Sequence, residues 1–197
     1  MRASLLSTTL LLAGLSGGIA ATAAGQAAAK TTVVHDASLS DAALIANALS
    51  AAPASVAAGA TVIGHDGRVL RKGTTDWVCM PDIPSLNNDS PMCLDAPWRA
   101  VIDAWVNKRS LTVTQVGFGY MLQDDLPVSN TDPFATASTP TNQWLQNSGP
   151  HVMVLLPDQR LLEGVSTDPT NGGPYVMWKG TPYAHIMVPA PRAPKKQ

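Results

Sequence analysis

Two short segments of the sequence place a histidine two residues before a methionine. They are His151-Val152-Met153 and His185-Ile186-Met187, both in the C-terminal part of the chain. Each segment belongs to an apolar run of strand length, and residues i and i+2 of a strand point to the same face of a sheet. Each H-x-M segment is therefore expected to hold an imidazole beside a thioether, about 6 to 7 Å apart at the backbone.

Imidazole and thioether are soft ligands that suit Cu(I), and they persist in an oxidising compartment, where thiolates are lost to disulfides. The pattern resembles the H-x-M element of periplasmic copper chaperones over these two tripeptides, without the spacing of that family's other ligands. If the two strands are neighbours, four side chains can converge on one metal ion. These candidate copper ligands are His151, Met153, His185 and Met187.

The pairing of the last two strands decides whether Met177 can join this site. A two-residue turn at Gly180-Thr181 would place Val176 opposite His185 and turn Met177 to the other face. Met177 is then a reserve ligand that a one-residue slip would bring in. The alternative interpretation is structural, because methionine fills gaps in cores and a histidine at a strand end often satisfies a backbone carbonyl.

A hydrolase is the competing functional class. His151 or His185 could act as a general base, and Asp82, Asp89 and Asp95 could supply carboxylates for glycoside hydrolysis. The sequence contains no G-x-S-x-G elbow, no H-E-x-x-H segment and no phosphate-binding glycine loop. We therefore expect a non-catalytic binding or interaction domain, with a secreted hydrolase as the alternative.

Residues 123–142 show no pattern of a helix or a strand. An unstructured stretch of this length inside a domain is usually a lid, a binding loop or a mobile segment. Together with Trp144, this loop is the surface that we expect to meet a partner protein or a small ligand. Its oxygen-bearing residues lack the D-x-D-x-D-G spacing of a calcium loop; they are Asp124, Asp125, Asn130 and Asp132.

The first 25 residues have the pattern of a secretory signal peptide. Met1-Arg2 supplies a positive charge, residues 5–20 are uncharged and mostly apolar, and Ala21-Thr22-Ala23 offers small residues for cleavage. The apolar stretch is shorter than the roughly 20 residues that span a bilayer, and no later segment reaches that length. The sequence therefore predicts a secreted or periplasmic protein without a membrane span.

Cys79 and Cys93 are the only cysteines in the sequence. In an oxidising compartment such a pair is expected to form a disulfide, closing a loop of about 15 residues and stabilising the fold by roughly 3 kcal/mol. The segment between them contains three prolines and little periodic pattern. It also contains a glycosylation sequon at Asn88, which matters only in a eukaryotic source.

Composition narrows the class of protein that carries these residues. The chain has 197 residues, of which 45% are hydrophobic and 14% charged, and its net charge is -1. These values exclude a disordered chain and a basic nucleic-acid binder. Sixteen prolines and fifteen glycines favour short elements joined by many turns over a helical bundle.

We therefore predict a single α+β domain over residues 39–189, after a flexible lead-in at 26–38 and before a disordered tail at 190–197. The expected fold is an antiparallel sheet of hairpins with two or three helices packed on one face and one disulfide. The predicted helices lie at 40–51 and 96–108; the predicted sheet regions lie near 61–71, 111–122, 150–156 and 175–188.

Two local patterns add detail to this fold. Asp66-Gly67 lies between two apolar runs and suits a type I′ hairpin turn. Between Val116 and Leu122, larger side chains alternate with Gly117 and Gly119, which leaves one face of the strand nearly bare. A helix lying on these glycines is the expected cause, and a ligand approaching the backbone is the functional alternative.

Overall fold

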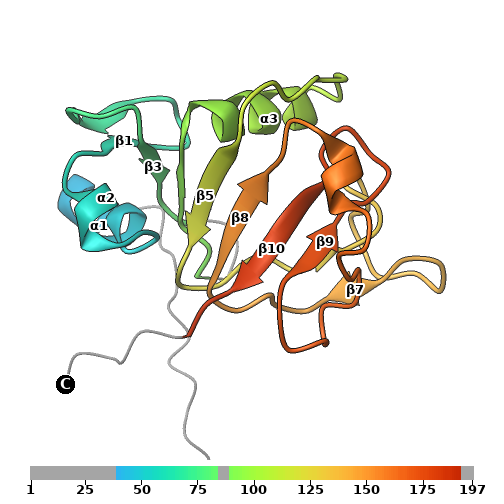
Figure 1. Ribbon diagram of the computed structural model, residues 1–197. Coiled ribbons are helices and arrows are strands. Elements are labelled where there is room, and N and C mark those ends of the chain that lie inside the picture. The colour runs from blue at the N-terminus through green and yellow to red at the C-terminus, as the bar shows by residue number, and fades with distance from the viewer. Residues whose placement is uncertain (1–38, 84–88, 192–197) are drawn as a thin grey trace, which may run out of the picture. The chain divides into compact units, whose positions relative to one another are not determined.

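One large β-sheet forms the framework of residues 39–83 and 89–191, the part of the chain that the computed structural model describes. Its strands are β1 (Thr61–Ile63), β2 (Val69–Arg71), β3 (Val78–Met80), β4 (Met92–Leu94), β5 (Gly117–Met121), β8 (His151–Leu155), β9 (Tyr175–Met177) and β10 (His185–Pro189). Their order is β2-β1-β3-β4-β5-β8-β10-β9, and Figure 1 shows the run from β5 to β9. Neighbouring strands of this sheet are antiparallel, except that β1 and β3 are parallel.

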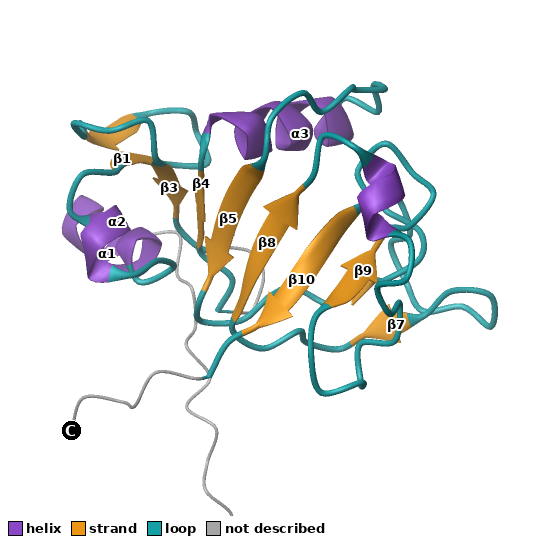
Figure 2. Ribbon diagram, viewed as in Figure 1, coloured by secondary structure: helices purple, strands orange, loops and turns teal. Residues whose placement is uncertain are grey.

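The helices lie on both faces of this sheet. They are α1 (Asp41–Leu49), α2 (Ala54–Ala57) and α3 (Ala96–Val106), with a short 3-10 helix, η1 (Gln159–Leu162). Figure 2 shows α1 and α2 beside β1 and β3, and α3 beside β4 and β5. The buried face of α1 packs with Cys93, whereas α3 packs with Leu94. Because Cys93 and Leu94 are successive residues of β4, their side chains point to opposite faces.

The predicted α+β class is confirmed. Each of the four expected sheet regions contains a strand, and each of the two expected helical regions contains a helix. Three details differ from the expectation. The helices do not share a face, one strand pair is parallel, and β3 and β4 were not predicted. β3 and β4 were missed because strands of three residues are too short to show an alternating pattern in the sequence. In the structure the disulfide joins these two strands.

The hairpin of β1 and β2 is also confirmed, but its turn is of a different type. The N–H of Gly67 donates to the carbonyl of Gly64 at 2.9 Å. Gly67 has a φ of 80°, whereas Asp66 is not among the described residues with positive φ. A type I′ turn requires positive φ at both central residues, so Asp66-Gly67 does not form one.

The bare face of β5 lies under α3, as the helix interpretation predicted. Asp95 caps α3 by accepting a hydrogen bond from the N–H of Trp98 at 3.0 Å. A Cβ at Gly119 would lie 2.8 Å from Cε of Met153 and 2.9 Å from Cδ2 of Leu94. The glycine thus lets core side chains beneath α3 approach the strand more closely than any larger residue would allow.

The same face of the sheet collects methionines. The pairings of β3 with β4, of β5 with β8, and of β10 with β8 and β9 place these methionines on the side that carries Leu94 and Trp98. We call this side the methionine face. It holds every methionine after the initiator: Met80, Met92, Met121, Met153, Met177 and Met187.

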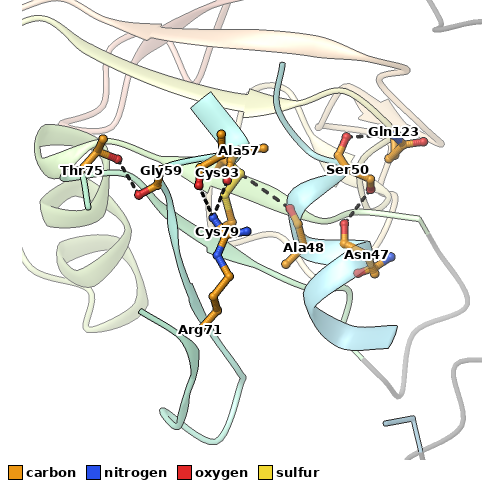
Figure 3. Close-up of a disulfide and its surroundings, with 11 residues drawn as sticks. Asn47, Ala48, Ser50, Ala57, Gly59, Arg71, Thr75, Cys79, Cys93 and Gln123 are labelled. Carbon is orange, nitrogen blue, oxygen red and sulfur yellow. Dashed lines mark hydrogen bonds between the residues drawn. A yellow bond between two sulfur atoms is a disulfide. The ribbon is translucent and has the colours of Figure 1, made fainter. Parts of the chain in front are cut away.

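The predicted disulfide is present between β3 and β4. Cys79 and Cys93 are directly paired, with Cα atoms 4.0 Å apart, and both are fully buried. Figure 3 shows the bond beside α1, where the carbonyl oxygen of Ala48 contacts Sγ of Cys93 at 3.6 Å. The disulfide therefore belongs to the core under α1, as expected of a structural bridge.

Segment 123–142, expected to be a loop, contributes one strand. Within it, β6 (Val128–Ser129) pairs with β7 (Trp144–Leu145) as a second, two-stranded sheet. No helix among the described residues is long and apolar enough to cross a membrane. The predicted signal peptide, the sequon at Asn88 and most of the predicted tail lie outside the described residues.

Candidate functional site

A pocket of about 260 Å³ lies between α3 and the methionine face, next to the segment 125–135. Its wall is apolar, apart from His185 and Asp125. We call it the His185 pocket. Three tryptophans line it, Trp98, Trp105 and Trp178, together with five methionines, Met92, Met121, Met153, Met177 and Met187.

His185 begins β10, and its ring is buried with one nitrogen unpaired. Nδ1 lies 2.9 Å from the carbonyl oxygen of Tyr183, which can only accept, so Nδ1 carries the proton. Nε2 then holds a lone pair, and it has no hydrogen-bond partner among the described residues. A buried acceptor left unpaired costs about 1–3 kcal/mol. His185 thus carries a buried, unused electron pair, and the residue is one of those that line the pocket.

The charge state of His185 follows from the same burial. Desolvation lowers the pKa of His185 to about 4, which outweighs the opposing effect of its hydrogen bond to Tyr183. The charge of a protonated His151 opposes that of His185 and lowers the pKa of His185 further. His185 is therefore neutral at pH 7, and its Nε2 is available to a hydrogen-bond donor or to a metal ion.

The tryptophans hold this ring from two sides. Trp98 and Trp178 meet His185 in edge-to-face geometry, with ring centroids 4.9 and 5.2 Å away. Trp105 stacks on Trp178 at 5.5 Å. The indole N–H groups donate to backbone carbonyls, that of Trp98 to Met153, that of Trp105 to Pro133 and that of Trp178 to Ser129. The three indoles therefore offer the pocket only their rings.

Trp178 adopts a backbone conformation that bulky residues rarely adopt. Its φ is 56°, and such strain costs of the order of 1–3 kcal/mol unless the surroundings impose it. Here they do, because its backbone N–H donates to the carbonyl of Asn130 and its indole N–H to that of Ser129, both at 2.8 Å. Segment 125–135 and the Trp178 turn are thus fixed to each other at the pocket.

The strained turn also explains why the predicted register of β9 and β10 is wrong. His185 pairs with Met177, not with Val176. Two successive turns, closed by hydrogen bonds from Thr181 to Trp178 and from Ala184 to Thr181, replace the expected two-residue turn. Met177, the reserve ligand, therefore lies directly opposite His185 on the methionine face.

The four predicted copper ligands are only partly brought together. β8 and β10 are neighbours, and Met153 is paired directly with Met187. His151, however, lies opposite Pro189, which is four residues, or about 13 Å of strand, beyond His185.

Each histidine ring is also tied to the backbone just before its own strand. His151 Nδ1 is 2.7 Å from the carbonyl of Gly149, and His185 Nδ1 bonds to Tyr183, so each ring is tied back beyond the start of its own strand. Because the strands are antiparallel, these starts lie at opposite ends. His151 is not among the residues that line the His185 pocket. Its Nε2 has no hydrogen-bond partner within the described residues.

Two of the three carboxylates considered for hydrolysis, Asp82 and Asp95, have structural contacts. Asp82 is buried and binds the side chain of Asn47 and the N–H of Ser90. Asp95 caps α3 and also accepts the N–H of Phe118 at 2.6 Å. These bonds join α1, β5 and the disulfide loop, so they account for both carboxylates without a reaction.

Segment 123–142 does not gather its oxygen ligands into a cation site. Asp124 accepts the N–H of Gly149, Asp132 accepts that of Phe134, and the Asn130 side chain donates to Gln143. Burial raises the pKa of Asp125, opposed by the neighbouring His151. Within the described ranges, the structure contains no group of three or more histidine, cysteine or acidic residues that could hold a metal.

Comparisons with protein families, with curated proteins and with solved structures found no match to this chain. The residues that line the pocket are therefore the basis for any statement about its ligand. Periodicity identified Trp98 and Trp105 only as a core stripe, since both also serve the core. The signal in the sequence that could have indicated the pocket was the gathering of methionines in the C-terminal strands, with three of the six after the initiator in residues 151–187.

Proposed function

We propose that this chain is an exported binding domain and that the His185 pocket is its ligand site. The observation that carries the proposal is the lone pair of Nε2, which is buried and unpartnered among the described residues and belongs to a residue that lines a mostly apolar pocket. The signal-peptide pattern of the first 25 residues and the disulfide support a secreted or periplasmic location.

The chemistry of the pocket defines what a ligand must bring. A core that needed only to be filled would be more stable with an aliphatic side chain in place of His185, since the unpaired acceptor costs free energy. A ligand that accepts the electron pair recovers that loss. Two classes of ligand can do so: a molecule with an N–H or O–H donor, and a soft metal ion.

A small, mainly apolar molecule with one donor fits the pocket best. An ion occupies only a small part of 260 Å³, whereas the apolar lining rewards a molecule that fills the space. Methionine side chains adapt to the outline of such ligands because they are unbranched and flexible. Binding of this kind needs no catalytic group.

A soft metal ion such as Cu(I) is the second candidate, supported by the register around His185. Met177 lies opposite His185, Met187 is two residues further along the same strand, and Met153 pairs with Met187. The Nδ1–H group of His185 already donates a hydrogen bond to a backbone carbonyl, as metal-binding histidines commonly do. This revised ligand set keeps three predicted residues and replaces His151 with Met177.

The alternative of a secreted hydrolase receives less support. A histidine general base acts on a nearby hydroxyl or water and is often oriented by a carboxylate. In the described part of the chain, the ring hydrogen bonds of His65, His151 and His185 all go to backbone carbonyls. The binding proposal depends on this arrangement at His185, because the hydrogen bond of Nδ1 to a backbone carbonyl leaves Nε2 for a ligand.

Methionine-methyl NMR tests the proposal on the intact domain without assuming which ligand binds. The protein is labelled with [¹³Cε]methionine and titrated with indole, with cyclohexanol and with Ag(I), a d¹⁰ ion that stands in for Cu(I). The proposal expects the methyl signals of Met153, Met177 and Met187 to shift with at least one probe. Met80 is the internal control, because it lies on the methionine face but does not line the pocket.

The pattern of shifts decides between the candidates. An organic probe that moves several pocket methyls supports the small-molecule site, and Ag(I) that moves only Met153, Met177 and Met187 supports the metal site. If no probe moves any pocket methyl at millimolar concentration, or if Met80 shifts as much as the others, the pocket is not the ligand site.

A further inference from the structure

The His185 pocket is large enough for more than one aromatic ring. An engineered apolar cavity of about 150 Å³ in another protein binds benzene. The pocket here measures about 260 Å³, so a molecule of two fused rings fits its volume. It lies just below the usual size range of ligand pockets, which begins at about 300 Å³, and this argues against a long chain or a sugar.

The wall of the pocket favours an aromatic molecule over an aliphatic one. Trp98, Trp105 and Trp178 have committed their N–H groups to backbone carbonyls, so they contribute π surface and ring edges. Thioethers add to this, because contacts between sulfur and aromatic rings are favourable. An aliphatic ligand of equal size would bury as much apolar surface, but it would make neither the ring contacts with the indoles nor the contacts with sulfur.

One polar atom defines the position of a donor on that molecule. Of the buried polar atoms without a partner in the described residues, only Nε2 of His185 belongs to a residue that lines the pocket. It is an acceptor, because Nδ1 carries the proton. A neutral N–H or O–H satisfies it at a lower desolvation cost than an ammonium group, since the lining is apolar apart from His185 and Asp125.

Trp178 adds a strained backbone position to the residues that line the pocket. It is a bulky residue at a φ of 56°, and it is buried between His185 and Trp105. Strained positions of this kind cluster at binding and active sites. A turn serving only as a connection would be expected to place glycine there, as the following turn does at Gly180, whose φ is 81°.

We propose that the ligand of the His185 pocket is a neutral aromatic molecule of one or two rings that carries a single N–H or O–H and donates it to Nε2 of His185. This inference rests on the proposed function, and it narrows the ligand to one chemical class. Indole is the simplest probe of that class, because its N–H lies on the rim of a two-ring apolar body.

A matched pair of ligands tests the inference on the unmodified protein. Indole and 1-benzothiophene have similar size and shape, but benzothiophene has sulfur in place of the N–H. Calorimetric titration is expected to show indole binding about tenfold more tightly, since one hydrogen bond to an otherwise unpaired buried acceptor is recovered. Equal affinity of the two ligands would overturn the inference while leaving the pocket as a binding site.

Two histidine variants locate the discriminating atom. His185→Phe keeps an aromatic ring between Trp98 and Trp178 but removes the lone pair, so the preference for indole should disappear and benzothiophene binding should persist. His151→Phe is the matched control: this residue also begins a strand of the same sheet but does not line the pocket, so the tenfold preference should remain. Loss of the preference in His151→Phe and not in His185→Phe contradicts the assignment.

The same titrations separate this inference from the proposed function. If neither aromatic ligand binds while Ag(I) or cyclohexanol shifts the pocket methyls, the aromatic class is wrong and the pocket remains the ligand site. If His185→Phe does not fold, the comparison of indole with benzothiophene on the wild-type protein still decides the question.

Discussion

Met177 lies directly opposite His185 across the pair of β9 and β10, and both side chains belong to the methionine face. The pairing follows from the turn between the strands, in which Trp178 adopts a positive φ. A tighter turn would have placed Val176 opposite His185 and removed Met177 from the pocket. The composition of the pocket therefore depends on a single step of register.

Cross-strand cysteines test that register. The double variant Met177→Cys/His185→Cys should form a second disulfide on mild oxidation, because directly opposite Cβ atoms lie about 4.5–5.5 Å apart. Val176→Cys/His185→Cys should not, since these two side chains point to opposite faces. Mass spectrometry of peptides from the non-reduced protein identifies the links. A Val176–His185 link formed in preference to the other would show that the strands pair in the tighter register.

Gly119→Ala should destabilise the fold by about 1–3 kcal/mol, measured by urea unfolding. The added methyl would meet Met153 and Leu94 at less than 3 Å, under the cover of α3. Gly173→Ala is the control, because the nearest atom to its new methyl is 3.7 Å away and its φ is not positive. Equal free energies of unfolding for the two variants would mean that α3 does not close the methionine face at β5.

The fold could be predicted in outline from the sequence because α3 and the strands that follow have long, regular patterns. The cap at Asp95 and the stripe through Trp98 and Val101 predicted the helix, and the structure confirms it. The bare glycine face of β5 likewise predicted a close neighbour. These signals are local, so sequence periodicity alone carries them.

The site could be predicted only in part because it depends on long-range pairing. The H-x-M pattern correctly placed His185 and Met187 on one face, but it could not show that His151 lies outside the pocket or that Trp178 lines it. Those facts arise from antiparallel register and from a strained turn that no local pattern indicates. The sequence also did not predict that α1 and α3 pack on opposite faces of the sheet, because that too depends on long-range pairing.

Replacing both cysteines by alanine should lower the free energy of unfolding by about 3 kcal/mol. Cys79 and Cys93 lie in the core under α1, so the loss should be seen by far-UV circular dichroism as a shifted urea midpoint. Reducing the wild-type protein should produce the same shift. An unchanged midpoint in both experiments would show that β3 and β4 hold together without the bond.

The stability of the fold should fall as the pH is lowered from 6.5 to 4. The pKa of His185 is about 4 in the folded protein and 6.5 without burial, so in this range the unfolded chain binds a proton that the folded protein does not. This difference favours unfolding, and its full effect is about 3 kcal/mol. The free energy of unfolding is thus free of this penalty above pH 6.5, and it falls as the pH drops from 6.5 to 4.

Urea unfolding at a series of pH values measures this effect, with His185→Phe as the reference. The variant should lack the part of the pH dependence that His185 contributes. Identical slopes for the two proteins between pH 6.5 and 4 would mean that His185 is not buried in the neutral form.

The most direct test of the account is the ¹⁵N NMR signal of Nε2 in [¹⁵N]histidine-labelled protein, recorded with and without indole at neutral pH. Without ligand, His185 should give the signal of an unprotonated Nε2 that accepts no hydrogen bond. Saturation with indole should shift that signal to lower frequency, towards that of a hydrogen-bonded nitrogen, while Nε2 of His151 stays in place. A His185 signal that is already protonated without ligand, or that does not move at saturation, would contradict the central claim that this lone pair is the contact made with the ligand.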